Sequence, residues 1–349
     1  MVALLAVRHA TKVFGGGRLL RAKAVTVALQ DFSLNVHTEP PSITAIVGES
    51  GSGKTTLARL LLGVAAPTSG EVLYQGKDLR TLSREERRRF LRDVQVIFQD
   101  PYEVYNPFYK VDHVLETPIK NFGLAKSGEP TRALMEETLN AVGLRPEETL
   151  GRHPHQLSGG QRQRIMVARA LLIQPRVIIA DEPVSMVDAS LRATILESLR
   201  QLHVRFGISM LYITHDLTTA YQVSDNIIVL YRGEMAEVGD VDLVVKKPLH
   251  PYTQLLIQSI PAADTSKRWT LQDVSADMPS RVESTQGCRF ANRCPMVMEM
   301  CRTTTPPLFR TEHGRAAACF LYRDRPQLDA SELDSLLARR SAPVVETVA

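Results

Sequence analysis

The chain has 349 residues and a mass of 38.8 kDa, which suits one large domain with an appendage or two domains. Its net charge of +4 is mild, so a mixed solvated surface is favoured over a nucleic-acid-binding face. No apolar run approaches the ~18 residues of a membrane-spanning helix, and the apolar start is too short for a signal peptide and lacks a basic lead. We therefore expect a protein that stays in the cytoplasm and reaches a membrane only through a partner.

The first hundred residues have a β-rich pattern that is interrupted once. Residues 25–29 and 31–36 alternate or nearly alternate in polarity, as half-buried strands do. The apolar run 42–47 leads into a glycine-rich loop, and residues 54–62 then carry one apolar helical stripe. This part of the chain is therefore predicted to be sheet, with one loop and its helix inserted.

The glycine-rich loop at residues 48–55 fits the pattern G-x-x-x-x-G-K-[ST]. Its glycines permit backbone angles at which successive N–H groups converge on anionic oxygens, and the following helix points its positive end at the same place. Lys54 adds a charge for the β- and γ-phosphates of a nucleotide, and the Thr55 hydroxyl suits Mg²⁺. The alternative is a plain Gly/Ser turn before a helix, which the later motifs disfavour. The residues expected to line this phosphate loop are Gly48, Glu49, Ser50, Gly51, Ser52, Gly53, Lys54, Thr55 and Thr56.

A strand is expected at 94–98, and residues from about 101 to 152 read as helical segments separated by Pro and Gly, which indicates an inserted helical subdomain. The pentapeptide Leu-Ser-Gly-Gly-Gln follows at 157–161. Its Ser158 and Gln161 form a capping box that opens a helix, and the glycines between them bare N–H groups at the helix end, which makes a second anion site. Because one domain needs only one phosphate site, we infer that this one serves a nucleotide held by another subunit; the alternative is a purely structural helix start. The residues expected at this second site are Ser158, Gly159, Gly160 and Gln161.

Short apolar runs without alternation return at 176–180, 209–213 and 226–230, as buried parallel strands show. Asp181 and Glu182 end the first of these runs, and ligand sites in open α/β sheets lie at such carboxyl ends. We expect Asp181 to hold Mg²⁺ and Glu182 to act as the general base for the water that attacks the γ-phosphate. The alternative is a helix N-terminus with favourable acidic residues.

The only cysteines are Cys288, Cys294, Cys301 and Cys319, all within one tenth of the chain. In a reducing compartment this clustering favours a metal site over disulfides. Four thiolates suit either a [4Fe–4S] cluster or Zn²⁺, although the spacings differ from paired C-x-x-C sites. Unliganded thiols are the third possibility. Residues 341–349 are expected to be disordered.

The phosphate loop and the pentapeptide together resemble the ATP-binding cassette family, in which two such domains clamp ATP between the loop of one and the pentapeptide of the other. The resemblance implies roles for several single residues. Gln99 looks like the glutamine that contacts Mg²⁺ and the attacking water, and His215 like the switch histidine that touches the γ-phosphate. Asp188 looks like the aspartate at the dimer seam. Phe14 is a candidate for the aromatic ring that stacks on adenine, with a core Phe as the alternative.

Signals outside the ATPase core narrow the family. Residues 98–102 with Asn106-Pro107, residues 250–256 with Ile260-Pro261, and residues 287–295 are similar to ATPases of dipeptide/oligopeptide importers. The chain departs from the usual sequence of that subfamily at residues 39–42, 104–107 and 184–188.

The resemblance implies an α/β fold, a P-loop NTPase with a RecA-like parallel sheet core, an antiparallel β subdomain and a helical subdomain. We expect the ATPase domain at residues 1–245, with the helical subdomain at about 101–170. A small cysteine-containing extension is expected at 246–325 and a polar tail at 326–349. The implied cofactors are ATP and Mg²⁺.

The implied function is that of an ATP-hydrolysing subunit, converting ATP and water to ADP and phosphate, which powers an importer of di- or oligopeptides or of a related solute such as an oligosaccharide or nickel. Its implied partners are a second ATPase subunit (itself or a paralogue), two transmembrane permease subunits and, indirectly, an extracytoplasmic solute-binding protein. Its implied place is the cytoplasmic face of the inner membrane, and no nucleic acid is expected. The rival classes are a cassette ATPase acting on nucleic acid or ribosomes, and a P-loop kinase or GTPase.

Overall fold

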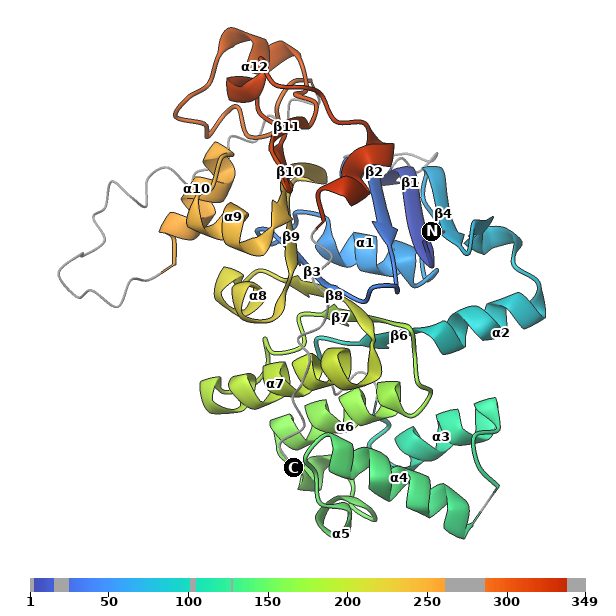
Figure 1. The fold of residues 1–349 in the computed structure, drawn as a ribbon. Helices are drawn as coiled ribbons and strands as arrows, with labels where there is room; N and C mark the ends of the chain where they lie inside the picture. The colour runs from blue at the N-terminus through green and yellow to red at the C-terminus, as the bar shows by residue number, and fades with distance from the viewer. Residues whose placement is uncertain (1–2, 16–24, 101–104, 127, 261–285, 338–349) are drawn as a thin grey trace, which may run out of the picture.

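Two β-sheets enclose one helix, and a separate group of helices lies beyond the edge of the larger sheet (Figure 1). The computed structural model describes residues 3–15, 25–100, 105–126, 128–260 and 286–337. Helix α1 (Lys54–Leu61) lies between the two sheets, where Leu57, Leu60 and Leu61 are buried. These leucines are the apolar stripe that the sequence predicts, so the phosphate loop is anchored at its start by a helix whose inner face is removed from water.

The larger sheet has eight strands in the order β11-β12-β10-β9-β3-β8-β7-β6. The strands β3, β6, β7, β8 and β9 run parallel, and their near-continuous burial is why each reads as an unbroken apolar run. The turn at Arg232-Gly233 reverses the chain into β10, which is antiparallel to β9. The strands are β3 (Ile43–Val47), β6 (Val94–Ile97), β7 (Val177–Asp181), β8 (Ser209–Thr214), β9 (Asn226–Tyr231), β10 (Glu234–Asp240), β11 (Phe309–Glu312) and β12 (Arg315–Ala317).

The smaller sheet is antiparallel, with the order β2-β1-β4-β5. The two strands expected at 25–29 and 31–36 form one continuous strand with a bulge. At the bulge, Asp31 takes a φ of 44° and the register with β1 shifts. The Asp31 N–H donates to Thr11 Oγ1 at 3.0 Å. The strands are β1 (Leu5–Phe14), β2 (Thr26–Val36), β4 (Ser69–Tyr74) and β5 (Lys77–Asp78).

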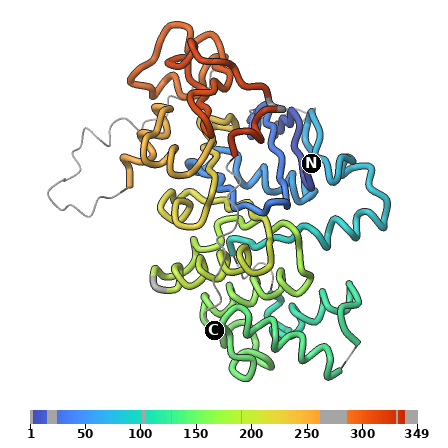
Figure 2. The backbone as a smooth tube through the Cα atoms, viewed as in Figure 1, coloured from blue at the N-terminus to red at the C-terminus, as the bar shows by residue number. Residues whose placement is uncertain are grey.

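The inserted helices form a lobe of their own, drawn in green in Figure 2. Its core includes Leu115 and Leu139, both 0% exposed. The lobe joins the sheet through α6, whose Gln163 side chain donates to the Phe98 carbonyl after β6. The helices of the lobe are α3 (Asp112–Phe122), α4 (Glu129–Ala141), α5 (Pro146–Thr149) and α6 (Gly159–Leu171). Helix α2 (Arg84–Asp93) lies outside the lobe and leads into β6.

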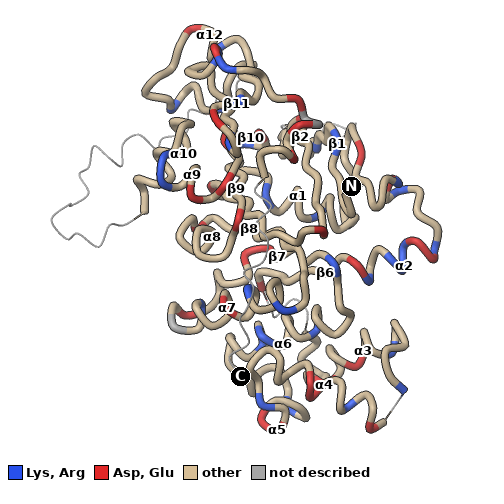
Figure 3. Tube along the Cα trace, viewed as in Figure 1, with Lys and Arg blue, Asp and Glu red and all other residues tan. Residues whose placement is uncertain are grey.

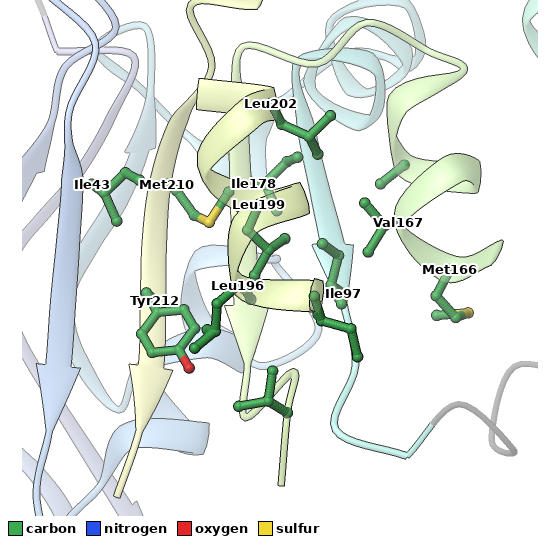
Figure 4. Packing of buried hydrophobic residues seen from close by; sticks show 14 of the residues in the cluster. Ile43, Ile97, Met166, Val167, Ile178, Leu196, Leu199, Leu202, Met210 and Tyr212 are labelled. Atoms are coloured by element: carbon green, nitrogen blue, oxygen red, sulfur yellow. The ribbon is translucent and has the colours of Figure 1, made fainter. Parts of the chain in front are cut away.

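The other face of the larger sheet is covered by α7, whose Leu196, Leu199 and Leu202 lie in one buried cluster with Met210 and Tyr212 of β8 (Figure 4). Burying each such leucine stabilises the fold by about 1.5–3 kcal/mol. Helix α7 ends at Phe206, and Gly207 after it takes the left-handed conformation common after helices. The remaining helices are α7 (Ala189–Phe206), α8 (Leu217–Val223), α9 (Val241–Lys246), α10 (Pro251–Gln258) and α12 (Glu299–Thr303).

The C-terminal segment is built into both sheets. Strands β11 and β12 extend the larger sheet beyond β10, and a short 3₁₀ helix at Ala330–Ser335 lies against β2. Leu333 and Leu336 are 2% and 1% exposed, and Asp334 accepts hydrogen bonds from Asn35 and His37. The first part of the expected polar tail is therefore packed against the rest of the protein. Residues 338–349, with the expected disordered end, lie outside the described residues, as does Pro261.

Charges of both signs are interspersed over the described chain, as along α2 (Figure 3). Within the same residues, no helix combines the length and the apolar character needed to cross a membrane.

Candidate phosphate-binding and hydrolysis site

The phosphate loop joins β3 to α1 and lies tightly against two neighbouring strands. A Cβ on Gly48 would meet the Leu230 carbonyl oxygen at 2.1 Å, and one on Gly53 would meet the Ala28 carbonyl oxygen at 2.4 Å. Gly53 also takes a φ of +106°, which L side chains rarely adopt. Only glycine fits at these two positions, so the loop's sequence is dictated by the packing that holds its N–H groups in place.

Lys54 lies inside this loop and is 5% exposed. Its Nζ donates to the carbonyl oxygens of Gly48 at 2.7 Å and Glu49 at 2.9 Å. Burial lowers the pKa of Lys54, and the carboxylates of Glu182, Asp181 and Glu49 oppose that effect. A phosphate oxygen would be a stronger partner for this ammonium than two neutral carbonyls, because both members of the pair would then be charged.

Asp181, at the end of β7, presents a buried Oδ1 that has no hydrogen-bond partner within the described residues. Burial raises the pKa of Asp181, with the neighbouring Glu182 charge adding to the effect and a hydrogen bond from Thr55 opposing it. An unpartnered buried carboxylate oxygen is costly, and a divalent cation would satisfy it. Asp181 and Thr55 are therefore chemically suited to hold Mg²⁺.

Three candidate catalytic residues from different strand ends meet in one hydrogen-bond network. Gln99 Nε2, after β6, donates to Glu182 Oε2 at 3.0 Å, and His215 Nδ1, after β8, lies 3.0 Å from Glu182 Oε1. Glu182 takes a left-handed φ of 47°, a conformation that costs free energy for a non-glycine residue, and its N–H donates to the Ile213 carbonyl. The parallel sheet thus places at one edge three side chains that are far apart in sequence.

The pentapeptide opens α6 through the predicted capping box, which the structure confirms. Gln161 N–H donates to Ser158 Oγ at 3.2 Å, and Ser158 N–H donates to Gln161 Oε1 at 2.9 Å. A Cβ on Gly160 would meet Leu191 of α7 at 2.7 Å, whereas one on Gly159 would meet open space. Ser158 is exposed and Gly159 is half-buried, so the start of α6 is open to solvent at these two residues.

Asp188 and Phe14 both lie on the surface. Asp188 is exposed at the start of α7, where its carbonyl accepts the N–H groups of Leu191 and Arg192. Phe14, at the end of β1, is 46% exposed, and Lys12 Nζ lies 5.2 Å from its ring centroid. Phe14 is therefore not a core residue, which leaves its ring available to stack on a ligand.

Tyr252 and Arg293 contact the phosphate loop, and the sequence predicted neither contact. Glu49 N–H donates to the Tyr252 hydroxyl at 2.9 Å, and Arg293 donates to both carboxylate oxygens of Glu49, at 2.9 and 3.1 Å. Arg293 and Glu49 are separated by 244 residues, and no spacing pattern connects such a pair.

The four cysteines line one cavity next to His250 and Phe290, and all four are free thiols. Burial raises the pKa of Cys288 and of Cys319 to about 11. Among the described residues, however, no group of three or more His, Cys, Asp or Glu side chains is placed to hold a metal ion. The expected four-cysteine metal site is thus not formed as a ligand set in this structure. Cys301 is buried in a small apolar cluster, and Cys288 and Cys294 are half-buried against the core.

Comparison with known families and relatives gives consistent matches. The family described as "ABC transporter" matches residues 29–185, and the family described as "Oligopeptide/dipeptide transporter, C-terminal region" matches residues 236–301. The chain is 41% identical over 281 residues to YkfD of Bacillus subtilis, named as an oligopeptide transport ATP-binding protein, with 80% of this chain and 85% of the relative covered. It is 38% identical over 320 residues to the di/tripeptide transport ATP-binding protein DppF of Pseudomonas aeruginosa, with 91% and 98% covered.

Solved structures agree on the fold. The chain resembles the dimeric structure of MJ0796, a bacterial ABC transporter cassette, with a TM-score of 0.59, 29% identity and coverage of 68% of this chain and 98% of that one. It also resembles CbiO1 of Clostridium perfringens, with a TM-score of 0.59, 24% identity and coverage of 71% and 92%. The latter likeness concerns the fold alone.

Proposed function

The chain belongs to the ABC transporter family as an ATP-binding, ATP-hydrolysing subunit, and we propose that it powers the import of di- or oligopeptides. The assignment of peptides as the transported solute is supported by the match of residues 236–301 to the oligopeptide/dipeptide transporter C-terminal region. The peptide-transport names of the relatives support it as well. A native strain lacking this chain is expected to lose uptake of a labelled dipeptide or pentapeptide, and the wild-type chain is expected to restore it. Restored uptake of an oligosaccharide or of nickel, with peptide uptake unchanged, would reject the peptide cargo.

The proposed chemistry is attack of a water on the γ-phosphate of ATP. Glu182 takes the proton of that water as general base, while Gln99 and His215 hold its carboxylate in place through their hydrogen bonds. Lys54 and the N–H groups of the loop bind the phosphates. Asp181 and Thr55 would hold Mg²⁺, which supplies charge neutralisation on the phosphate oxygens.

We propose that the hydrolytic unit is a dimer, of this chain with itself or with a paralogue. The exposed start of α6, at Ser158 and Gly159, would meet ATP held by the other subunit, with Asp188 at the seam. The dimeric form of the MJ0796 cassette supports this arrangement. Closure of such a dimer draws on γ-phosphate contacts from both sides, which ADP cannot supply.

The proposed partners in the membrane are two permease subunits, fed by an extracytoplasmic solute-binding protein, with this chain held peripherally at the cytoplasmic face. The helical lobe, joined to the site through Gln99 and Gln163, is suited to pass dimer closure to them. Mild detergent purification of tagged chain from its native membranes is expected to recover the permeases. Recovery of nucleic acid or ribosomes without permeases would favour the rival class of cassette ATPase.

We propose further that the four cysteines bind a [4Fe–4S] cluster on assembly, with Zn²⁺ as the alternative. The grouping of Cys288, Cys294, Cys301 and Cys319 around one cavity, all as free thiols, supports this. Protein purified without oxygen is expected to be brown, to absorb near ~400 nm and to contain iron and acid-labile sulfide. Colourless, iron-free protein would reject the cluster, and stoichiometric zinc would establish the alternative.

A further inference from the structure

The C-terminal region grips the phosphate loop at one residue. Glu49, the second residue of that loop, is held at its N–H by the Tyr252 hydroxyl and at its carboxylate by Arg293. Tyr252 belongs to α10 and Arg293 follows the first cysteine by five positions, so both lie within the segment that matches the oligopeptide/dipeptide transporter region. The phosphate loop therefore has a brace that comes from outside the ATPase core.

Packing fixes both bracing side chains. Tyr252 is 0% exposed, and its ring lies 4.5 Å from that of Tyr231 and 5.5 Å from that of Phe290. The Arg293 guanidinium lies 5.9 Å and 5.7 Å from the same two ring centroids. A planar guanidinium that is stacked in this way presents a rigid fork, and a two-point contact with a carboxylate fixes orientation as well as distance.

The brace continues into the residues that meet phosphate. The carbonyl of Glu49 accepts from Lys54 Nζ at 2.9 Å and from the Ser52 N–H at 3.1 Å. Fixing Glu49 at its N–H and side chain therefore fixes the peptide group that orients the loop lysine and the turn of the loop. Because the loop is already ordered, phosphate binding does not have to overcome the entropy of ordering it.

We propose that Tyr252 and Arg293 are positioning residues, which hold the phosphate loop in its ATP-binding form from the C-terminal region. This inference rests on the ATP site of the proposed function and extends it to residues that no ATP motif contains.

A neighbouring ion pair supplies a matched control. Arg289 Nε donates to Glu234 Oε1 at 3.0 Å, with both side chains largely buried. Arg289 follows Cys288 as Arg293 precedes Cys294, so the two arginines are equally close to the cysteines in sequence. Arg289 pairs with β10 rather than with the loop. A variant of Arg289 therefore reports general damage to the C-terminal region without damage to the brace.

The test measures the dissociation constant of Mg-ATP by calorimetry on the full chain. Arg293→Met is expected to raise it about tenfold and Tyr252→Phe several-fold, since a hydrogen-bonded charge is lost in the first and a neutral contact in the second. The KM for ATP should rise in parallel, while kcat at saturating ATP stays within about twofold. Arg289→Met should leave the dissociation constant unchanged, even where it lowers the melting temperature.

A double-mutant cycle separates the contact from other effects of each change. In a Glu49→Ala background, Arg293→Met should shift the dissociation constant by less than about twofold, because the carboxylate that Arg293 contacts is already gone. An unchanged constant in Arg293→Met, or an equal rise in Arg289→Met, would overturn the inference. Failure of the wild-type chain to bind ATP would instead overturn the proposed function.

Discussion

Replacing Glu182 by Gln is expected to abolish hydrolysis while ATP stays bound. The substitution keeps the length and planarity of the side chain, which is 16% exposed and touches two neighbours. The carbonyl of the introduced amide can accept from Gln99 as the carboxylate does, and its NH₂ group can donate to a neutral His215. The network survives, and what disappears is its one carboxylate, the group assigned to take a proton from water.

The size of the effect follows from that loss. General base catalysis contributes about 10²–10⁴-fold, so turnover should fall by that factor. The carboxylate of Glu182 raises the pKa of Asp181 and opposes the lowering of the Lys54 pKa. Its removal therefore favours the ionised Asp181 that Mg²⁺ needs, and a bound phosphate keeps Lys54 charged. Affinity for Mg-ATP should be retained or increased.

Phosphate release and size-exclusion chromatography with light scattering measure the two halves of this prediction. The E182Q variant should show negligible turnover and an ATP-dependent dimer that ADP does not support. Glu136→Gln, which breaks an exposed pair with Arg132 in α4, should behave as wild type. Turnover near the wild-type rate in E182Q would place the base elsewhere and refute the assignment.

Three further predictions follow from burial and capping. Burial raises the pKa of Asp181, so the folded protein loses stability relative to the unfolded chain as pH rises through that pKa. Asp181→Asn should therefore raise the melting temperature of the nucleotide-free protein at neutral pH and cancel the rise produced by Mg-ATP. An unchanged Mg-ATP effect would count against the Mg²⁺ role. Burial lowers the pKa of His250 to about 4, so the unfolded chain binds a proton below about pH 6.5 that the folded chain does not. The free energy of unfolding in urea should therefore fall by up to about 3 kcal/mol as the pH is lowered from about 6.5 to about 4. This loss should be absent in His250→Asn. Ser158→Ala should lower the free energy of unfolding by about 1 kcal/mol and also reduce ATP hydrolysis. Ser83→Ala removes the equivalent capping box of α2, so it should lower the free energy of unfolding equally and leave hydrolysis intact. Equal hydrolysis in the two variants would refute a nucleotide role for Ser158.

The core fold and the meeting of the candidate residues were predictable, since phosphate chemistry restricts which residues serve. Gly53 has to accept a positive φ beside the Ala28 carbonyl, and Lys54 has to follow it at the helix start. Buried parallel strands can be recognised in the sequence as apolar runs, and their carboxyl ends lie at the same edge of the sheet. Gln99 and Glu182, 83 residues apart, therefore become neighbours by topology alone.

What the sequence concealed depends on contacts without periodicity. The short strands β11 and β12 are four and three residues long and gain their pairing only because β10 offers a free edge. Leu333 and Leu336 look like apolar residues of a short polar stretch, without a helical or strand period, until β2 covers them. The thiols are a different case, because their clustering in sequence predicts ligation, whereas the described residues show one shared cavity and no assembled ligand set.

The boundary expected near residue 245 marks a change of sequence character rather than a physical division. Glu237 of β10 is 0% exposed and accepts the N–H groups of Leu249, at 3.1 Å, and His250, at 2.9 Å, while Arg315 of β12 lies 3.9 Å away. Burial raises the pKa of Glu237, and these partners oppose the rise. Removing the partners of a buried charge costs about 3–5 kcal/mol, so the ATPase core is completed by the segment that follows it. A chain organised in this way can place the brace of its phosphate loop in that segment, because Arg293 and Tyr252 are anchored to the same sheet whose strand ends carry Asp181 and Glu182.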